Sequence, residues 1–307
     1  MIDTNQINNW LIQAGEIGLK LQQNIKAAEK ADKTLVTQAD RDIEQFLTQQ
    51  IKSHYPDHAI IAEEGTKSLG QEYSWIIDPL DGTGAYATGL PIWSISVGIL
   101  KGLKPYLGFI YVPSTQETYY TASPDKVFYK ASLLSSLPVP TINQKSSIFI
   151  SPRTFQYYQL DFPGNIYSLG SGIMHHCLVT RGIATCSLSL EPSIWDLAGV
   201  YPLLQATGAT IKYLSGKSLI LADLIKGNKT TEPILCGHPD AINQIAAMIL
   251  PKWKNIEASY STSMACFGLI ITCSTKPGMN FLSSYAANHC LKMKWHTTFT
   301  GPVINWG

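Results

Sequence analysis

Charged residues are scarce in this 307-residue sequence: they make up 15% of it, and the net charge is only +1. A nucleic-acid-binding protein normally presents a basic face, so this balance argues against a nucleic acid as a partner. The same balance gives no electrostatic reason to bind an anionic membrane surface. Hydrophobic residues make up 45% of the chain, which is enough for a sizeable core.

Long apolar runs are lacking as well. The longest candidate, Met264 to Cys273, is well short of the roughly 20 apolar residues that a membrane span needs. The first residues show no basic patch followed by an apolar run, so we expect no signal peptide. These absences favour a cytoplasmic protein without a membrane partner.

Metal-binding cysteine patterns are also absent. The six cysteines form no Cys-x-x-Cys pair, which argues against a zinc ribbon or a thioredoxin-type site and favours buried, inert side chains. His175 and His176 are adjacent, but neighbouring side chains on a helix point about 100° apart and share no ligand face. We assign these two histidines no role.

What the sequence does contain is an alternation of helical and strand patterns. Helices are expected at 4–26 (capped by Thr4), from Thr37 onward, and at 171–181, 196–206 and 239–249. Strands are expected at 58–62, 73–78, 91–100, 106–113, 117–122, 147–150 and 232–237. This alternation predicts layered sheets covered by helices.

The stretch from Ser132 to Lys145 lacks periodicity and holds two prolines, so we place a domain boundary there. We expect sub-domains at residues 1–140 and 141–253. The segment 254–307 shows no clean element, and we interpret it as an unrecognised tail that is either an appendage or poorly ordered.

The segment DPLDGT at residues 78–83 is the strongest candidate for a metal site. It follows an expected strand, and its proline and glycine favour a sharp turn that aims Asp78 and Asp81 at one point and exposes the Leu80 carbonyl. Magnesium prefers hard oxygen ligands of this kind. Asp-Pro and Asp-Gly are also ordinary turn formers, so the segment alone leaves a plain turn equally open.

Other acidic positions have ordinary interpretations when each is taken alone. Glu63 and Glu64 follow the strand at 58–62 and suit a solvated loop. Asp196 suits a helix N-cap, and Asp40 completes a capping box with Thr37.

In combination, the carboxylates of Glu63, Asp78, Asp81 and Asp196 predict a cleft that binds cations. Such a set repels itself unless cations neutralise it. Two or three magnesium ions and a phosphate would balance the charge, as in two-metal phosphoryl-transfer sites, where the metals activate water and stabilise the leaving oxygen.

Further polar groups extend this prediction. Thr83 offers a hydroxyl that can orient a water molecule, and Asp40 can take up its proton. The segment Gly170-Ser171-Gly172 opens a helix, so its amides can cradle an anion. A tight turn with close packing is an equal alternative for that segment.

These segments resemble the inositol monophosphatase family, which lies among the magnesium-dependent, lithium-sensitive phosphatases. The resemblance covers roughly residues 4–253 and rests on LVTQAD ending at Asp40, AEE at 62–64, WIIDPLDGT at 75–83 and WDLAG at 195–199. It implies an α-β-α-β-α sandwich of two sub-domains, a homodimer, and hydrolysis of a small phosphate monoester by a metal-activated water.

The resemblance also implies roles by position. The implied magnesium ligands are Glu63, Asp78, the carbonyl of Leu80, Asp81 and Asp196. The implied catalytic residues are Asp40, Glu63 and Thr83. The implied phosphate and substrate contacts are Gly82, Thr83, Gly170, Ser171 and Gly172.

Departures from the family pattern bear on the substrate. Ser189 stands where the animal enzymes have a glutamate that contacts the inositol ring, and Gly84-Ala85 replace the usual Thr-Asn or Lys-Asn. No cluster of Arg or Lys lies near these segments, which disfavours a second phosphate subsite.

An inositol monophosphate, or a related polyol or sugar phosphate, is the leading substrate. The enzyme alternatives are a 3′-phosphoadenosine 5′-phosphate phosphatase, a histidinol-phosphate phosphatase and a sugar bisphosphatase. The non-enzyme alternative is an inactive paralogue that acts as a binding or scaffold protein.

Overall fold

The computed structural model describes residues 2–25, 27–30, 35–68, 70, 72–225 and 229–252. The predicted tail at 254–307 lies outside these described residues. Within them, no helix has both the length and the apolar character needed to cross a membrane.

Two large sheets organise the described chain. The first has eight strands in the order β10 (Ser132–Leu133), β9 (Lys126–Tyr129), β8 (Glu117–Ser123), β7 (Lys104–Val112), β6 (Ser94–Lys101), β5 (Tyr73–Asp81), β3 (Ala59–Ala62) and β4 (Lys67–Ser68). The second has five, in the order β13 (Asn165–Tyr167), β11 (Ser147–Ile150), β14 (Cys186–Ser189), β16 (Ile234–Gly237) and β15 (Thr210–Tyr213). Two small sheets pair β1 (Ala27–Glu29) with β2 (Leu35–Thr37) and β12 (Tyr158–Leu160) with β17 (Ile249–Pro251).

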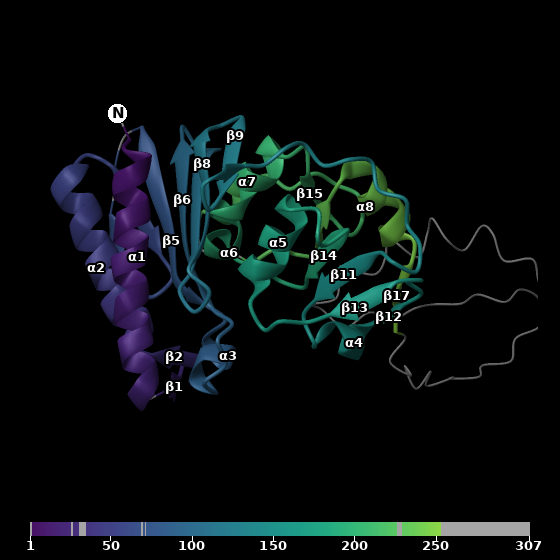
Figure 1. The fold of residues 1–307 in the computed structure, drawn as a ribbon, viewed down its shortest axis with the longest axis horizontal. Helices are drawn as coiled ribbons and strands as arrows, with labels where there is room; N and C mark the ends of the chain where they lie inside the picture. The colour runs from purple at the N-terminus through teal and green to yellow at the C-terminus, as the bar shows by residue number, and fades with distance from the viewer. Residues whose placement is uncertain are drawn as a thin grey trace, which may run out of the picture. The chain divides into compact units, whose positions relative to one another are not determined.

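Helices form layers on both faces of these sheets (Figure 1). α1 (Thr4–Leu21) and α2 (Gln38–His54) pack on the eight-stranded sheet. α5 (Gly172–Thr180), α6 (Ile194–Ala198) and α7 (Val200–Ala206) lie between the sheets, and α8 (Pro239–Ala246) packs on the five-stranded sheet. The short helices are α3 (Thr83–Ala87), α4 (Thr154–Tyr157), η1 (Gln22–Asn24) and η2 (Leu221–Leu224). The expected α-β-α-β-α layering is confirmed.

Strand alternation explains why these layers form. Trp75 and Ile77 of β5 join the core under α1 and α2, whereas Ile76 joins the core that α5, α6 and α7 share. On β11, Ile148 and Ile150 pack in the core beneath α8, whereas Phe149 joins the middle core. Because side chains alternate across a strand, each sheet buries both of its faces. The predicted division near residue 140 stays a prediction.

The structure corrects several expected boundaries. α1 is capped by Asp3, whose carboxylate accepts the amides of Asn5 (3.0 Å) and Gln6 (3.1 Å), and not by Thr4. The expected helix at 196–206 is divided into α6 and α7 at Gly199. The expected strand at 73–78 continues to Asp81, so the predicted turn at 79–82 is wrong over most of its length.

Candidate metal centre and active site

An irregularity in β5 sets the positions of two acidic side chains. Asp78 pairs with Ser96 of β6, and Asp81 pairs with Ser94, so three residues of β5 span two of β6. In a regular strand, residues three apart point to opposite faces, and one extra residue restores them to the same face. Pro79 lacks an amide hydrogen and is tolerated at such a bulge. Both carboxylates therefore face the helices of the middle layer.

Asp196 comes from the first turn of α6. It is the third helical residue and not the cap: the amide of Ser193, the N-cap, donates to its Oδ2 at 2.6 Å. The helix approaches the sheet closely because Gly98 and Gly108 are cross-strand partners. A methyl group added at Gly98 would clash with the carbonyl group of Ala198, so only glycine admits this contact.

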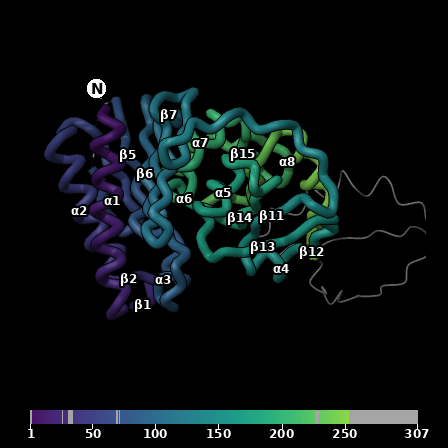
Figure 2. The backbone as a smooth tube through the Cα atoms, in the orientation of Figure 1, coloured from purple at the N-terminus to yellow at the C-terminus, as the bar shows by residue number. Residues whose placement is uncertain are grey.

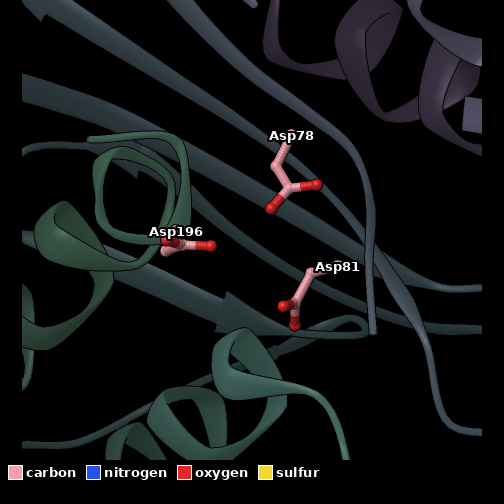
Figure 3. A group of neighbouring side chains, drawn as sticks. All are labelled: Asp78, Asp81 and Asp196. Carbon is pink, nitrogen blue, oxygen red and sulfur yellow. The ribbon is translucent and has the colours of Figure 1, made fainter. Parts of the chain in front are cut away.

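These two elements bring three carboxylates together (Figure 3). Oxygen atoms of Asp78, Asp81 and Asp196 lie within 4.8 Å of one another. Burial, followed by repulsion from Glu63, Asp81 and Asp196, raises the pKa of Asp78 well above its ordinary value. Burial and the charge of Asp81 raise the pKa of Asp196 to about 8.

This donor set fits magnesium. Every donor is a hard carboxylate oxygen, which is the ligand that magnesium prefers. The raised pKa values show that the folded chain holds these negative charges at a cost, which a divalent cation would relieve.

The metal-free protein is expected to lose stability as the pH rises. The folded-state pKa values of Glu63 and Asp196 are about 7 and about 8, above their ordinary 4.5 and 3.8. Stability from a carboxyl with a raised folded pKa is present below its ordinary pKa and is lost as the pH rises through the folded value. In EDTA, the melting temperature should therefore fall between about pH 5 and about pH 9.

Magnesium should remove most of this decrease in melting temperature with pH. An Asp196→Asn variant in EDTA should show a smaller decrease than the wild type. A metal-free melting temperature that rises over the same pH interval would contradict the prediction.

A hydroxyl–carboxylate pair lies beside the cluster. The Thr83 hydroxyl lies 3.0 Å from the Leu80 carbonyl and 3.3 Å from Asp40 Oδ1, and it can donate to either. Asp40 is 1% exposed. Its Oδ2 accepts two hydrogen bonds from Thr37, one from the amide at 2.7 Å and one from the hydroxyl at 2.6 Å. Asp40 thus both caps α2 and faces Thr83. Burial raises its pKa, and the bonds from Thr37 oppose that shift.

The glycine segment at 170–172 packs directly against the turn after β5. Gly82 has φ of +90°, and a methyl group added there would lie 3.0 Å from the Ile92 carbonyl oxygen and 3.3 Å from that of Gly170. The Ser171 hydroxyl and the amide of Ile173 (2.9 Å) both donate to Asp81 Oδ2. The start of α5 therefore holds the protein's own carboxylate in this structure.

Glu63 lies near the cluster but outside the group within 4.8 Å. The Lys30 ammonium contacts it at 3.0 Å and contacts Glu64 at 2.5 Å. Burial alone would lower the pKa of Lys30, but the hydrogen bonds and negative charges of Glu64 and Glu63 raise this pKa above its ordinary value. Lys30 directly follows β1, whose partner β2 lies beside α3 (Figure 2). No local sequence pattern indicates the pairing of Lys30 with Glu63, because the two residues are 33 positions apart.

Glu44 is a second residue that the sequence analysis missed. It is 4% exposed, and its carboxylate accepts the amides of Glu64 (2.7 Å) and Thr66 (3.0 Å) and the Thr66 hydroxyl (2.6 Å). These bonds fix the loop that carries Glu63. A usable signal exists, since Glu44 lies one helical turn after Asp40 on the buried face of α2.

A Glu44→Gln variant is expected to bind magnesium about tenfold more weakly, because groups that orient metal ligands typically contribute 10–100-fold to affinity. An amide cannot accept all three bonds, so the Glu63 loop loses its fixed position. Titration calorimetry with magnesium measures the effect, and thermal unfolding identifies any general loss of stability. Glu16→Gln, at an exposed position of α1, is the matched control. An unchanged magnesium affinity in Glu44→Gln would refute this positioning role.

Comparison with known proteins relates the chain to one family. The sequence model described as the Inositol monophosphatase family matches residues 6–244. A fructose-1,6-bisphosphatase/inositol-1-monophosphatase of Aquifex aeolicus (strain VF5) is 29% identical over 219 residues, 68% of this chain and 82% of the relative. A 3′(2′),5′-bisphosphate nucleotidase CysQ of Haemophilus influenzae is 29% identical over 229 residues, 68% of this chain and 85% of the relative.

Solved structures show the same fold. A crystal structure of an IMPase/NADP phosphatase complexed with Mg²⁺ and phosphate has a TM-score of 0.70, with 80% of this chain and 93% of that chain covered. Its sequence identity is 19%, so the likeness concerns the fold alone.

Proposed function

We propose, from the premise that this chain belongs to the inositol monophosphatase family, that it releases phosphate from a small monoester at the centre formed by Asp78, Asp81 and Asp196. The chain is a phosphoric monoester hydrolase, as its phosphatase relatives indicate. The observation that carries the assignment of the centre is the set of three carboxylates within 4.8 Å, next to the Thr83–Asp40 pair.

The family is magnesium-dependent, and the acidic cluster is suited to hold the metal. We assign two or three ions to the following ligands: Glu63, Asp78, the Leu80 carbonyl, Asp81 and Asp196. When bound, magnesium supplies positive charge for the phosphate and for the attacking and leaving oxygens. The stoichiometry of magnesium binding, measured by calorimetry, tests the number of ions.

Thr83 and Asp40 position the attacking water. The Thr83 hydroxyl directs its hydrogen to the Asp40 carboxylate or the Leu80 carbonyl, so its lone pair faces outward to accept a hydrogen from water. Asp40, with its raised pKa, is a suitable acceptor for the proton that the water loses. Glu63 shares this role, since its pKa of about 7 lies near neutrality.

The backbone around the bulge holds the phosphate. We assign the phosphate to the amides of Gly82 and Thr83 at the start of α3. Gly170, Ser171 and Gly172 lie against Gly82 and, because donors at the start of α5 already bind Asp81, we assign them contacts with the rest of the substrate. We therefore assign the alcohol half of the substrate to the α5 side of the centre.

The substrate that we assign is an inositol monophosphate or a related polyol or sugar phosphate. A panel of inositol phosphates, sugar phosphates, histidinol phosphate and 3′-phosphoadenosine 5′-phosphate tests it, with magnesium and with EDTA. We expect magnesium-dependent phosphate release, fastest for a polyol or sugar phosphate. Well-folded protein that releases no phosphate from any compound would overturn the function and favour a scaffold role.

We also propose a homodimer in the cytoplasm. Light scattering coupled to gel filtration tests the dimer, and cell fractionation tests the location. A monomer at all accessible concentrations would contradict the first, and recovery outside the cytoplasm would contradict the second.

A further inference from the structure

A cavity of about 250 Å³ opens beside Asp196 and the start of α5, the side of the centre to which we assign the alcohol half of the substrate. Its walls come from the turn after β11, the start of α5, the segment that runs from β14 into α6, and the segment between η2 and β16 that carries Lys229. The charges and hydroxyls on these walls determine which alcohols fit.

The floor of the cavity is polar but uncharged. His176 is 1% exposed, with its Nδ1 2.8 Å from the Ser187 hydroxyl and its Nε2 3.3 Å from the Ser189 hydroxyl. Burial lowers the pKa of His176 to about 3, and that of the neighbouring His175 to about 4, so both rings are neutral near neutral pH. Ser189 therefore presents a hydroxyl, and no formal charge, to a ligand.

The walls carry two positive side chains, Arg153 and Lys229, and two negative ones, Glu191 and Asp196. Arg153 follows β11, and within the described residues its guanidinium makes no hydrogen bond or ion pair. Lys229 lines the same cavity, and its charge lowers the pKa of Asp196, which shows that it lies near the metal centre. Glu191 is the opposing charge at the rim, and Asp196 belongs to the metal centre.

We propose that this cavity binds a second anionic group on the alcohol half of the substrate, with Arg153 and Lys229 as its ligands. The proposal rests on the proposed function and, among the polyol and sugar phosphates assigned there, favours those with a second phosphate or a carboxylate over an inositol monophosphate. Arg153 and Lys229 are 76 residues apart in the sequence, which is why no local cluster of basic residues indicated such a subsite. In the fold, both line the same cavity.

The size of the cavity favours a compact alcohol. Pockets for small molecules usually measure roughly 300–1,000 Å³, and this one is slightly smaller. A sugar or polyol bisphosphate fits that description better than a nucleotide bisphosphate does.

Matched pairs of substrates test the proposal. The pairs are inositol 1-phosphate with inositol 1,4-bisphosphate, fructose 1-phosphate with fructose 1,6-bisphosphate, and adenosine 3′-phosphate with 3′-phosphoadenosine 5′-phosphate. We expect the wild type to have a higher kcat/KM for the doubly anionic member of at least one sugar or polyol pair. The preference is the kcat/KM for the doubly anionic member divided by that for the singly anionic member. Arg153→Gln and Lys229→Gln should each lower this preference about tenfold, because a charge-assisted hydrogen bond is lost.

Two further variants sharpen the result. Glu191→Gln removes the opposing negative charge and should raise the preference for the doubly anionic member. Lys126→Gln, at an exposed position of β9, should leave both members unchanged. Equal kcat/KM for both members of every pair, or equal losses on both in Arg153→Gln, would overturn the proposal. A preference for the doubly anionic member that is confined to the adenosine pair would overturn only the inference that the alcohol is a compact sugar or polyol.

Titration calorimetry of the same pairs separates this proposal from the proposed function. If no compound is hydrolysed, the proposed function fails, yet tighter binding of the doubly anionic members that Arg153→Gln abolishes would still support the subsite. Equal binding of both members would overturn it whether or not turnover occurs.

Discussion

An Asp78→Asn variant is expected to release phosphate about 10³-fold more slowly than the wild type. A metal acting as a Lewis acid contributes several kcal/mol to the transition state, and each 1.4 kcal/mol corresponds to a factor of ten in rate. Asp78 is the carboxylate at which burial and the charges of Glu63, Asp81 and Asp196 converge. Its replacement removes a ligand that no neighbouring side chain replaces. Initial rates over a range of magnesium concentrations measure the effect.

The same variant should be more stable than the wild type in the absence of metal. Asp78 is 1% exposed, and its amide replacement carries no charge to be repelled by Asp81 and Asp196. We therefore expect a higher melting temperature in EDTA together with the loss of activity. Asp57→Asn, at an exposed position outside the centre, is the control and should change neither quantity. Full activity of Asp78→Asn, or a lower metal-free melting temperature, would count against the proposed metal site.

A Thr83→Val variant is expected to lose about 100-fold in kcat, because general acid–base catalysis typically contributes 10²–10⁴-fold. Valine keeps the branched shape of threonine but cannot pass a hydrogen to Asp40 or accept one from water. Thr83→Ser, which keeps the hydroxyl, should retain most of the activity. Single-turnover measurement of phosphate release isolates the chemical step.

Magnesium affinity distinguishes this role from a structural one. Thr83→Val should bind magnesium nearly as tightly as the wild type, because Thr83 is not a proposed ligand. A kcat near the wild-type value would rule out its part in positioning water, and equal losses in the valine and serine variants would indicate a packing role.

The sequence predicted that Asp78, Asp81 and Asp196 lie together, but not the backbone geometry that gathers them. Segment 78–83 was identified from its residue types, because acidic residues next to turn formers are a local pattern, whereas segment 195–199 was identified through the family resemblance. The bulge that turns Asp78 and Asp81 to one face depends on pairing with β6, and pairing between strands is not local. The division of the helix at Gly199 likewise depends on close contact with β6 and β7.

Asp40 shows why competing interpretations of one residue need not exclude each other. The capping box and the proposed catalytic role were alternatives in the sequence, yet they are compatible, because one carboxylate oxygen accepts from Thr37 and the other lies within hydrogen-bond distance of the Thr83 hydroxyl. The partners missed entirely, Lys30 and Glu44, act through contacts between distant segments. Such contacts leave little trace in local periodicity.

The most direct test is to locate the metal. Crystals grown with manganese in place of magnesium, together with inorganic phosphate, would give anomalous difference peaks at each bound ion. We predict peaks among the carboxylates of Asp78, Asp81 and Asp196, with phosphate against the Gly82–Thr83 turn. Manganese bound only at other positions, in crystals of protein that is active with manganese, would contradict the assignment of this centre as the site of phosphate-ester hydrolysis.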